Sequence, residues 1–520
     1  RVLFRSLCLL QVWLPAYYPN CDGPCHLANA KAMAAMWWGQ DTGAYTRFYE
    51  FNTQPNPNWL NEIVLAVLQI PFSNVVAEKL LLSIYILSLM LGLARLLRHL
   101  NPTTAVWWLP AFSLLVIHNA MAQGFYNFTC SVAFFIWFIA SWLSFLNRQS
   151  IRGSVVCLVL LAGTYFSHPV SFVFACVAAG ALWLSFAASG TLQGRQRVLM
   201  PLAVMLMLVL PFVWMFLGFA DANGGLEEIK IAFTPKRLQE LAAMKYLINY
   251  SHKEADVLIA GGVIFTALLL LIVVGRIASV KGIHRYDGFL LTLLFAFIVF
   301  LLLPDAMLHG GYFVLRAGTY IYLLVLIACV WLPMPTIAGR VAGPVVLGVF
   351  VVLFAIRMPI IYEASAEIED QLSTLPYIKP GSVVLPLNYD TWGKGKDGRR
   401  LCSENNVFCH TLQYTGDIPG VVALDNFEAN TGYFPLNWHL AIDPFRHLGR
   451  WPGLQASPPA ADIAAYKQQT GVLIHYVVTS HLDDYWRNHE HAKALVAELA
   501  RDYHVVYRSP RGTTVLWQHN

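Results

Sequence analysis

The sequence predicts a polytopic α-helical membrane protein with about 11 transmembrane helices and a C-terminal α/β domain. Of its 520 residues, 57% are hydrophobic and only 12% are charged, far below the charged share of a soluble domain. Apolar runs of about 20 residues, the length that a helix needs to cross a bilayer, recur through the first two thirds of the chain. After Ile356 these runs stop, and acidic residues, His and Pro become frequent. We therefore expect a transmembrane domain over residues 1–357 and a second domain over 358–520.

The first expected span is Val2–Ala16. It lacks a small-residue cleavage site before Tyr17, so it is interpreted as a retained helix and not as a signal peptide. Ten further apolar runs follow: Leu80–Leu97, Thr104–His118, Phe125–Leu146, Ser154–Phe166, Val170–Ala187, Val198–Gly218, Asp256–Val274, Phe289–Leu303, Phe313–Trp331 and Val341–Ile356. The runs at 104–118, 154–166 and 289–303 are short for a span. The predicted number of membrane spans, eleven, can therefore change by one or two.

Arginine residues orient the helices, because basic side chains are retained on the cytoplasmic side. They fall in every second short loop: Arg95, Arg98, Arg148, Arg152, Arg195, Arg197, Arg276, Arg285 and Arg340. The remaining loops then face outward, and an odd number of spans that starts inside leaves the C-terminal domain outside. Arg357, directly after the last span, runs against this bias. The net charge of +5 is spread over loops, so the expected partner is the lipid bilayer and no nucleic acid.

The outer loop 17–79 holds a lone acidic residue, Asp22, in Cys21-Asp22-Gly23-Pro24-Cys25-His26 directly after the first span. A carboxylate at the membrane surface is partly shielded from water, and such a position favours a functional role. Two segments of this loop, His26–Trp38 and Trp59–Ile70, are Ala-rich or apolar but too short to span. We expect them to be helices in the outer interface.

Residues 358–520 alternate β-rich runs with a helical run, and this alternation predicts a small α/β domain. The expected strands are Ser382–Leu387, Gly471–Thr479, Tyr503–Tyr507 and Thr513–Trp517, and the expected helix is Asp484–Ala500.

Under this orientation, uncommon polar side chains gather at the outer ends of the spans. They are Asp22, His26, His118, His168, His309 and Arg316. A single histidine near a span end is usually an interfacial side chain, and an arginine there often extends to lipid head groups. The gathering of several such groups on one side is what favours a cavity open at the outer leaflet.

Two of these residues have complementary chemistry. A carboxylate such as Asp22 takes a proton from a hydroxyl or amine as that group attacks a sugar. A guanidinium such as Arg316 holds a phosphate through paired hydrogen bonds and stabilises it as a leaving group. Further candidates for the donor phosphate are Lys230, Lys236 and Arg237, for which a solvated helix face is an equally good interpretation. The histidines His26, His118, His168 and His309 are assigned to substrate binding.

Four of the nine cysteines lie in the predicted outer regions as two close pairs, Cys21/Cys25 and Cys402/Cys409. Two local disulfides and four free thiols are both open in an oxidising compartment. Cys21, Cys25 and His26 are also zinc-ligand types, but a fourth ligand is not apparent. The sequence therefore assigns no metal ligand.

At these residues the chain resembles the GT-C superfamily of integral-membrane glycosyltransferases, which includes the protein mannosyltransferases and the lipid A aminoarabinose transferases. The local patterns are the early acid in Asn20–Pro24, the Pro-rich helix entry Gln54–Leu60, the span start Ser73–Lys79 and its basic end Leu93–Arg98. The overall layout of spans, outer loop and outer C-terminal domain resembles the family over the whole chain.

This resemblance implies a polyprenyl-phosphate-linked sugar donor and a place in the inner (cytoplasmic) membrane with the C-terminal domain extracytoplasmic. Asp22 matches the position of the family's catalytic acid. Many members have two adjacent acids there, whereas Gly23 follows Asp22 in this sequence. That departure leaves a divalent cation cofactor open.

The predicted function is transfer of a sugar from a polyprenyl-phosphate donor to an acceptor at the outer face of the membrane. One alternative is a non-catalytic GT-C-like subunit of a larger membrane-protein complex, and another is a lipid or solute transporter. A transporter is expected to carry ionisable residues near the bilayer midplane, and these spans carry almost none. An Asp22 that lines a cavity would favour the enzyme, and an Asp22 covered by protein would favour the subunit.

Overall fold

The computed structural model describes residues 2–227, 229–279, 282–332, 336–395, 398–449, 453–454, 456 and 458–520. Among these residues, seven helices are long and apolar enough to cross a membrane. They are α4 (Asn74–Leu100), α7 (Tyr126–Asn147), α9 (Pro169–Ala188), α10 (Arg195–Ala222), α12 (Lys253–Ser279), α14 (Phe313–Trp331) and α15 (Thr336–Leu372). Each contains one predicted span, and the chain is a multi-pass membrane protein.

The other four predicted spans are shorter helices. They are α1 (Val2–Trp13), α5 (Ala105–Trp108) with the 3₁₀ helix η1 (Leu109–Leu115), α8 (Ile151–Ser167) and α13 (Gly288–Leu302). The change from α5 to η1 comes at Pro110, which has no backbone N–H to continue an α-helical ladder. All the apolar runs predicted from the sequence are therefore helical, and the shortest one is irregular.

Burial separates the helices of the bundle into central and peripheral ones. Nearly every residue of α14 from Phe313 to Val330 is buried, as expected for a helix that is apolar on all sides. By contrast, α10 exposes large apolar side chains such as Met207, Leu210 and Trp214. An exposed apolar face of this size suits contact with lipid.

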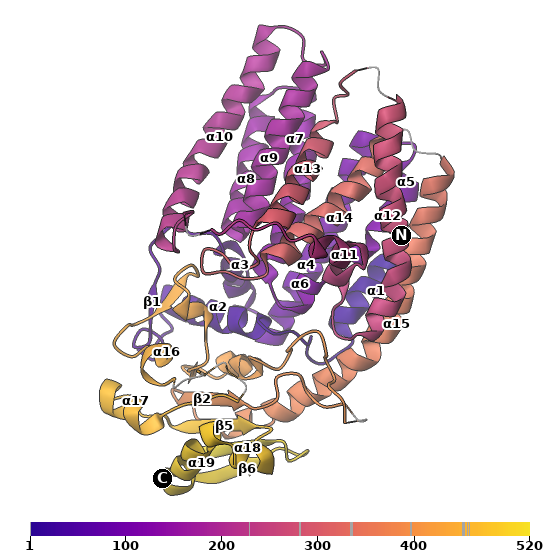
Figure 1. Ribbon diagram of the computed structural model, residues 1–520. Helices are drawn as coiled ribbons and strands as arrows, with labels where there is room; N and C mark the ends of the chain where they lie inside the picture. The colour runs from indigo at the N-terminus through magenta and orange to yellow at the C-terminus, as the bar shows by residue number, and fades with distance from the viewer. Residues whose placement is uncertain are drawn as a thin grey trace.

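The predicted interfacial helices are confirmed as helices α2 (Gly23–Trp37) and α3 (Leu60–Leu68), which pack against each other. Short helices also occur in other loops: α6 (Asn119–Ala122), α11 (Lys236–Ala242) and η2 (Lys245–Leu247). Figure 1 shows α2 between the helical bundle and the strands of the C-terminal region.

The C-terminal region contains a five-stranded mixed sheet in the order β3-β2-β5-β7-β6. Its strands are β2 (Val383–Asn388), β3 (Val422–Ala423), β5 (Tyr476–Ser480), β6 (Tyr503–Arg508) and β7 (Thr514–His519). β2 pairs in parallel with β3 and β5, and β7 pairs antiparallel with β5 and β6. Four of these strands were predicted, but the strand expected from Gly471 begins only at Tyr476, because Gly471 caps the preceding helix in a left-handed conformation.

Helices and 3₁₀ turns surround this sheet. They are η3 (Leu375–Tyr377), η4 (Thr411–Asp417), η5 (Glu428–Asn430), α16 (Pro444–His447), α17 (Ile463–Thr470), α18 (Asp484–Arg487) and α19 (Glu490–Asp502). The last two replace the single helix predicted over Asp484–Ala500.

Two features join the C-terminal region to the rest of the chain. A second, two-stranded sheet pairs β1 (Tyr49–Phe51) of the first loop with β4 (Leu436–Trp438). The helix α15 also continues well past the predicted span end at Ile356 and leads to the sheet (Figure 1). The first loop and the C-terminal region therefore form one packed layer at the end of the bundle.

The buried position of Arg357 in α15 explains why it runs against the predicted charge bias. Its guanidinium lies 2.7 Å from a carboxylate oxygen of Glu254 and donates to the carbonyl of Leu247. A charge neutralised inside the protein carries no orientation signal of the kind that applies to loops.

Candidate functional site

A cavity of about 520 Å³ lies where the helical bundle meets the first loop and the C-terminal region. Its polar wall includes Asp22, His26, His168, His309 and Arg316. The structure thus brings five of the sequence-selected residues to one cavity, although they come from three separate parts of the chain.

Backbone contacts hold Asp22 at the edge of this cavity. Its N–H donates to the carbonyl of Gln123 at 3.0 Å, and the next N–H, that of Gly23, donates to Asn20 Oδ1 at 2.6 Å. Gly124 has a φ of +84°, and a Cβ there would lie 2.7 Å from the Asp22 nitrogen. Only glycine fits this close approach of two loops.

The surroundings of Asp22 make it a stronger base than an exposed aspartate. Protein on most sides removes water from the carboxylate, and this desolvation raises its pKa to about 6, an effect that the nearby His410 partly offsets. A pKa near the working pH suits a group that accepts a proton during a reaction.

Next to Asp22 on the cavity wall, His26 contacts two buried carboxylates. Its Nδ1 lies 2.5 Å from Glu62 Oε1 and 3.0 Å from Glu428 Oε1. Burial lowers the pKa of His26, but the two carboxylates outweigh it and raise the pKa well above its usual value. One N–H cannot satisfy both carboxylates fully, and Glu62 Oε2 and Glu428 Oε1 make no hydrogen bond with the described residues.

These three side chains fit a divalent cation. One nitrogen of His26 and one oxygen each of Glu62 and Glu428 lie within 4.8 Å of one another, and the unsatisfied carboxylate oxygens supply lone pairs. An imidazole with two carboxylates is a common set of metal ligands. A cation held there would supply positive charge close to Asp22.

On another wall of the cavity, Arg316 in α14 carries a guanidinium without a carboxylate partner among the described residues. Its Cζ lies over the rings of Phe125 and Phe128 at 5.1 and 5.8 Å, and Nη1 donates to the carbonyl of Gly311. Its Nε has no hydrogen-bond partner in the same part of the chain. Two aromatic rings thus position a cation with unused donors.

Two of the three histidines on the wall, His168 and His309, occupy loop ends. His168 caps α9, its Nδ1 accepts a hydrogen bond of 3.2 Å from the Val170 nitrogen, and its ring meets Phe128 edge to face. His309 lies in the turn before α14 with a φ of +57°. Both side chains are therefore placed by local backbone geometry.

The cavity becomes apolar toward the bundle. Val173 and Phe174 in α9, together with Phe295 and Val299 in α13, continue its wall. At a rise of about 1.5 Å per residue, Phe295 lies roughly 10 Å along α13 from its end at Leu302. The cavity therefore has polar groups at the end of the bundle and an apolar part between the helices.

Four other predicted site residues do not line this cavity. His118 is fully buried between the rings of Tyr85 and Phe128. Arg237 donates to the carbonyls of Phe300 and Leu303 at 2.7 Å each. Lys230 and Lys236 are exposed side chains of the loop that leads to α11 and of α11 itself. That Lys230, Lys236 and Arg237 contact the phosphate of the sugar donor stays a prediction.

Several wall residues were not selected from the sequence. Glu62, which contacts the wall residue His26 but does not itself line the cavity, is a lone acid inside the apolar run Trp59–Ile70, and a lone acid in such a run is a sign of function. Glu428, Thr431, Tyr433 and Phe434 come from the C-terminal region. No local pattern marks them, because they reach the cavity only through the pairing of β4 with β1.

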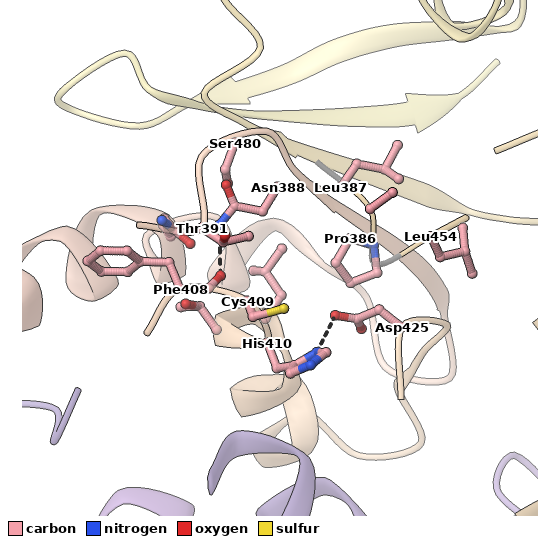
Figure 2. Close-up of a pocket in the computed structure, with 14 residues that line it drawn as sticks. Pro386, Leu387, Asn388, Thr391, Phe408, Cys409, His410, Asp425, Leu454 and Ser480 are labelled. Carbon is pink, nitrogen blue, oxygen red and sulfur yellow. Dashed lines mark hydrogen bonds and ion pairs between the residues drawn. The ribbon is translucent and has the colours of Figure 1, made fainter. Parts of the chain in front are cut away.

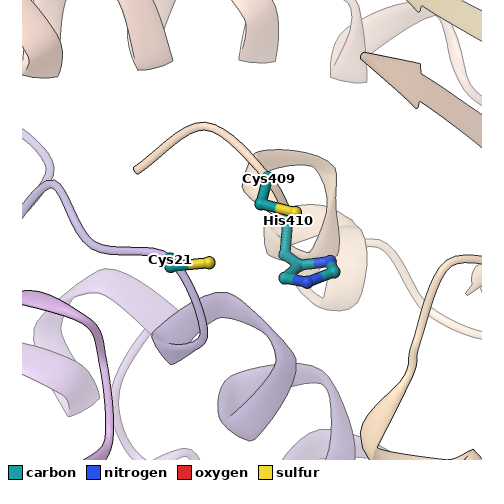
Figure 3. A group of neighbouring side chains, drawn as sticks. All are labelled: Cys21, Cys409 and His410. Atoms are coloured by element: carbon teal, nitrogen blue, oxygen red, sulfur yellow. The ribbon is translucent and has the colours of Figure 1, made fainter. Parts of the chain in front are cut away.

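The cysteines agree with the free-thiol interpretation and not with two local disulfides. All nine are free thiols, and Cys21 lies beside Cys409 and not in a local pair with Cys25. The third residue of the zinc set considered from the sequence, His26, contacts Glu62 and Glu428. The cysteine cluster instead includes His410 (Figure 3).

Solved structures show that the chain has the fold of the GT-C integral-membrane glycosyltransferases, which confirms the resemblance predicted from the sequence. The similar structures include ArnT from Cupriavidus metallidurans bound to undecaprenyl phosphate, with a TM-score of 0.57 at 10% identity over 99% of this chain and 97% of that one. ArnT in the apo state matches with a TM-score of 0.52 at 11% identity and the same coverage.

The oligosaccharyltransferase from Archaeoglobus fulgidus in its apo form has a TM-score of 0.45 at 12% identity, over 100% of this chain and 74% of that chain. No family model and no curated protein matches the sequence.

Proposed function

We propose that this protein transfers a sugar from a polyprenyl-phosphate donor to an acceptor at the outer face of the membrane. The observation that carries the proposal is one cavity with Asp22 and Arg316 on its wall and an apolar part between α9 and α13. Such a cavity suits a ligand with a charged head and a hydrocarbon tail. The solved ArnT with undecaprenyl phosphate, which has the same fold, supports a ligand of this class.

In the proposed reaction, the acceptor hydroxyl or amine attacks the anomeric carbon of the donor sugar. Asp22 takes the proton of the attacking group as the new bond forms. The bond between the anomeric carbon and the phosphate oxygen breaks, and the polyprenyl phosphate leaves with the electron pair. Arg316 stabilises the charge of the departing phosphate. A cation at His26, Glu62 and Glu428 would add to that stabilisation.

The proposal includes the arrangement in the membrane. Eleven spans start on the cytoplasmic side of the inner membrane, so the cavity and residues 358–520 face outward. In this arrangement His26, His168 and His309 contact the donor head group or the acceptor. Asp22 lies open on a cavity wall, and this favours an active enzyme over a non-catalytic subunit of the same fold.

The decisive test compares Asp22→Asn with Asp41→Asn in the purified full chain. Asp41 is in the same loop, but its carboxylate accepts hydrogen bonds from the Gly43, Tyr45 and Thr46 nitrogens and is off the cavity wall. In Asp41→Asn, the asparagine side-chain oxygen can still accept hydrogen bonds from backbone nitrogens, so the turn is expected to be retained. The assay follows release of polyprenyl phosphate from a panel of synthetic polyprenyl-phosphate hexoses and pentoses, with a membrane lipid extract as acceptor.

We expect Asp22→Asn to abolish release and Asp41→Asn to retain it, with both variants monodisperse. Full activity of Asp22→Asn would remove this residue from the mechanism. A wild-type chain that turns over none of the donors would favour the non-catalytic subunit.

A further inference from the structure

Outside the cavity wall, a cluster of thiols and an imidazole lies where the first loop meets the C-terminal region. The Sγ atoms of Cys21 and Cys409 and one ring nitrogen of His410 lie within 4.8 Å of one another (Figure 3). Cys21 directly precedes Asp22, whereas Cys409 and His410 directly precede η4. Residues from opposite ends of the chain thus converge on one point.

A third thiol completes the cluster. Cys25 is fully buried in the first turn of α2, close to His410, although its Sγ does not lie within 4.8 Å of all three atoms of the cluster. The spacing Cys21-x₃-Cys25 falls within the Cys-x₂₋₄-Cys spacing of structural zinc sites. Three thiols and one imidazole make a complete tetrahedral ligand set.

The separations suit a metal with thiolate ligands. A Zn–S bond of about 2.3 Å in a tetrahedron places neighbouring sulfur atoms about 3.8 Å apart. The separations among Cys21, Cys409 and His410, all within 4.8 Å, exceed that value by no more than about 1 Å.

The surroundings of His410 are those of a metal-bound imidazole. Its Nδ1 lies 3.6 Å from Asp425 Oδ2 (Figure 2). Gln413 Nε2 donates to Asp425 Oδ1 at 2.5 Å. Its ring stacks on Phe427 at 4.9 Å between centroids. A carboxylate beside the imidazole commonly orients a zinc-bound histidine.

A small void of about 20 Å³ adjoins Cys409, His410 and Asp425, as Figure 2 shows. This volume suffices for one small occupant. Of the four proposed ligands, Cys409 and His410 line this void.

We propose that Cys21, Cys25, Cys409 and His410 bind one structural Zn²⁺ ion, which fastens the loop that carries Asp22 to the C-terminal region. Four protein ligands leave no open coordination position, so this site is structural and separate from the group formed by His26, Glu62 and Glu428. Binding displaces the protons of the three thiols, which remain thiolates on the metal. The proposal stands on this cluster and does not depend on transferase activity.

Metal content and a cobalt spectrum of the purified full chain test the proposal. We expect about one zinc per chain by mass spectrometry after incubation with equimolar zinc chloride. Co²⁺ in place of zinc is expected to give sulfur-to-cobalt charge-transfer bands in the near ultraviolet and the visible bands of tetrahedral cobalt. Because the charge-transfer bands require thiolate ligands, they distinguish this site from the His26 group.

Two variants and a matched control accompany these measurements. Cys409→Ser and His410→Gln are expected to lose the zinc and the tetrahedral cobalt bands. The control is Cys402→Ser, because Cys402 is also buried and lies in the same segment but is not in the cluster. We expect Cys402→Ser to keep the zinc and the tetrahedral cobalt bands. If a variant fails to fold, the metal content and cobalt spectrum of the wild-type chain still test the proposal.

Three results would overturn the proposal. They are a wild-type chain that binds no zinc, a cobalt spectrum without sulfur charge transfer, and a disulfide-linked Cys21–Cys409 peptide as the main form in a digest without reductant. The last result would identify the cluster as a redox cross-link.

Discussion

Tyr414 donates a hydrogen bond of 2.7 Å to the carboxylate of Glu78, and this bond joins the C-terminal region to the first turns of a membrane helix. The same carboxylate accepts from Tyr126 at 2.5 Å and from Asn20 at 3.0 Å. Burial of a carboxylate costs free energy, and hydrogen bonds from three donors offset that cost. Glu78 is therefore the common anchor of α4, α7, the first loop and η4.

We expect Tyr414→Phe to lower stability, because it removes one hydrogen bond to a charged group, worth about 1.5–3 kcal/mol. The measurement is the Tm of the purified protein in detergent. Tyr485→Phe is the control, since the Tyr485 side chain is largely exposed. Equal Tm values for Tyr414→Phe and the wild type would show that the bond does not hold the two regions together.

Replacing Arg316 tests the proposed phosphate site. Arg316→Ala removes a charge-assisted contact and is expected to raise the Kd for undecaprenyl phosphate by about tenfold or more. Arg316→Lys keeps the charge but loses the planar fork, so an intermediate Kd is expected. Arg340→Ala is the control, because Arg340 also lies over an aromatic ring, at 5.6 Å from Trp107, but not on the cavity wall. Unchanged affinity of Arg316→Ala would move the phosphate site elsewhere.

Gly124→Ala is expected to slow transfer while undecaprenyl phosphate still binds. The new Cβ would meet the Gly23 nitrogen at 2.4 Å and push the Asp22 backbone away. A displacement of about 1 Å at a reacting group costs on the order of a hundredfold in rate. Gly39→Ala is the control, since Gly39 also has a positive φ of +65° but nothing within 4 Å of its Cβ position. Equal rates for the two variants would rule out the steric account.

The contact between α15 and the sheet is expected to weaken in acid. Burial by itself raises the pKa of Glu367, which lies beyond the apolar part of α15, but His481 and Arg511 outweigh it and lower the pKa below its ordinary value of 4.5. A lowered carboxyl pKa stabilises the fold above the ordinary value, and this stabilisation is lost as the pH falls below it toward the folded-state pKa. The remaining groups in this contact are Thr513 and Asp370.

The measurement compares the Tm of wild type and Glu367→Gln between about pH 7 and about pH 3, a range that extends below the ordinary pKa of 4.5. The difference between the two is expected to shrink as the pH falls, because protonation removes the same charge as the substitution. Glu369→Gln is the control, because Glu369 is exposed. A difference that stays constant with pH would contradict a role for the Glu367 charge.

The helices were predictable because span length and hydropathy are local properties. The place of Asp22 and Arg316 near one cavity was predictable for a related reason. Ionisable groups near the ends of membrane spans are rare, and they more often have a functional role than a purely structural one. Glu62 and Glu78 are also ionisable residues within apolar segments, so the sequence pointed to them in the same way. These two residues were missed as site or anchor residues because their partners, His26 and Tyr414, are distant in the sequence.

The C-terminal share of the cavity wall was not predictable. Glu428 and Tyr433 reach the wall because β4 pairs with β1, and three-residue strands leave no reliable sequence pattern. The neighbours of Cys21 were hidden for the same reason. Proximity in sequence suggested Cys25 and His26, whereas the tertiary fold adds Cys409 and His410 to Cys25.

The pairing of β1 with β4 has a consequence for biosynthesis. A ribosome delivers residues 49–51 early, yet their strand partners at 436–438 emerge only after the last membrane helix. The cavity therefore remains incomplete while the membrane helices are being inserted, and its last wall forms only after residues 436–438 have been made. A prematurely terminated chain would contain the membrane helices but lack this wall.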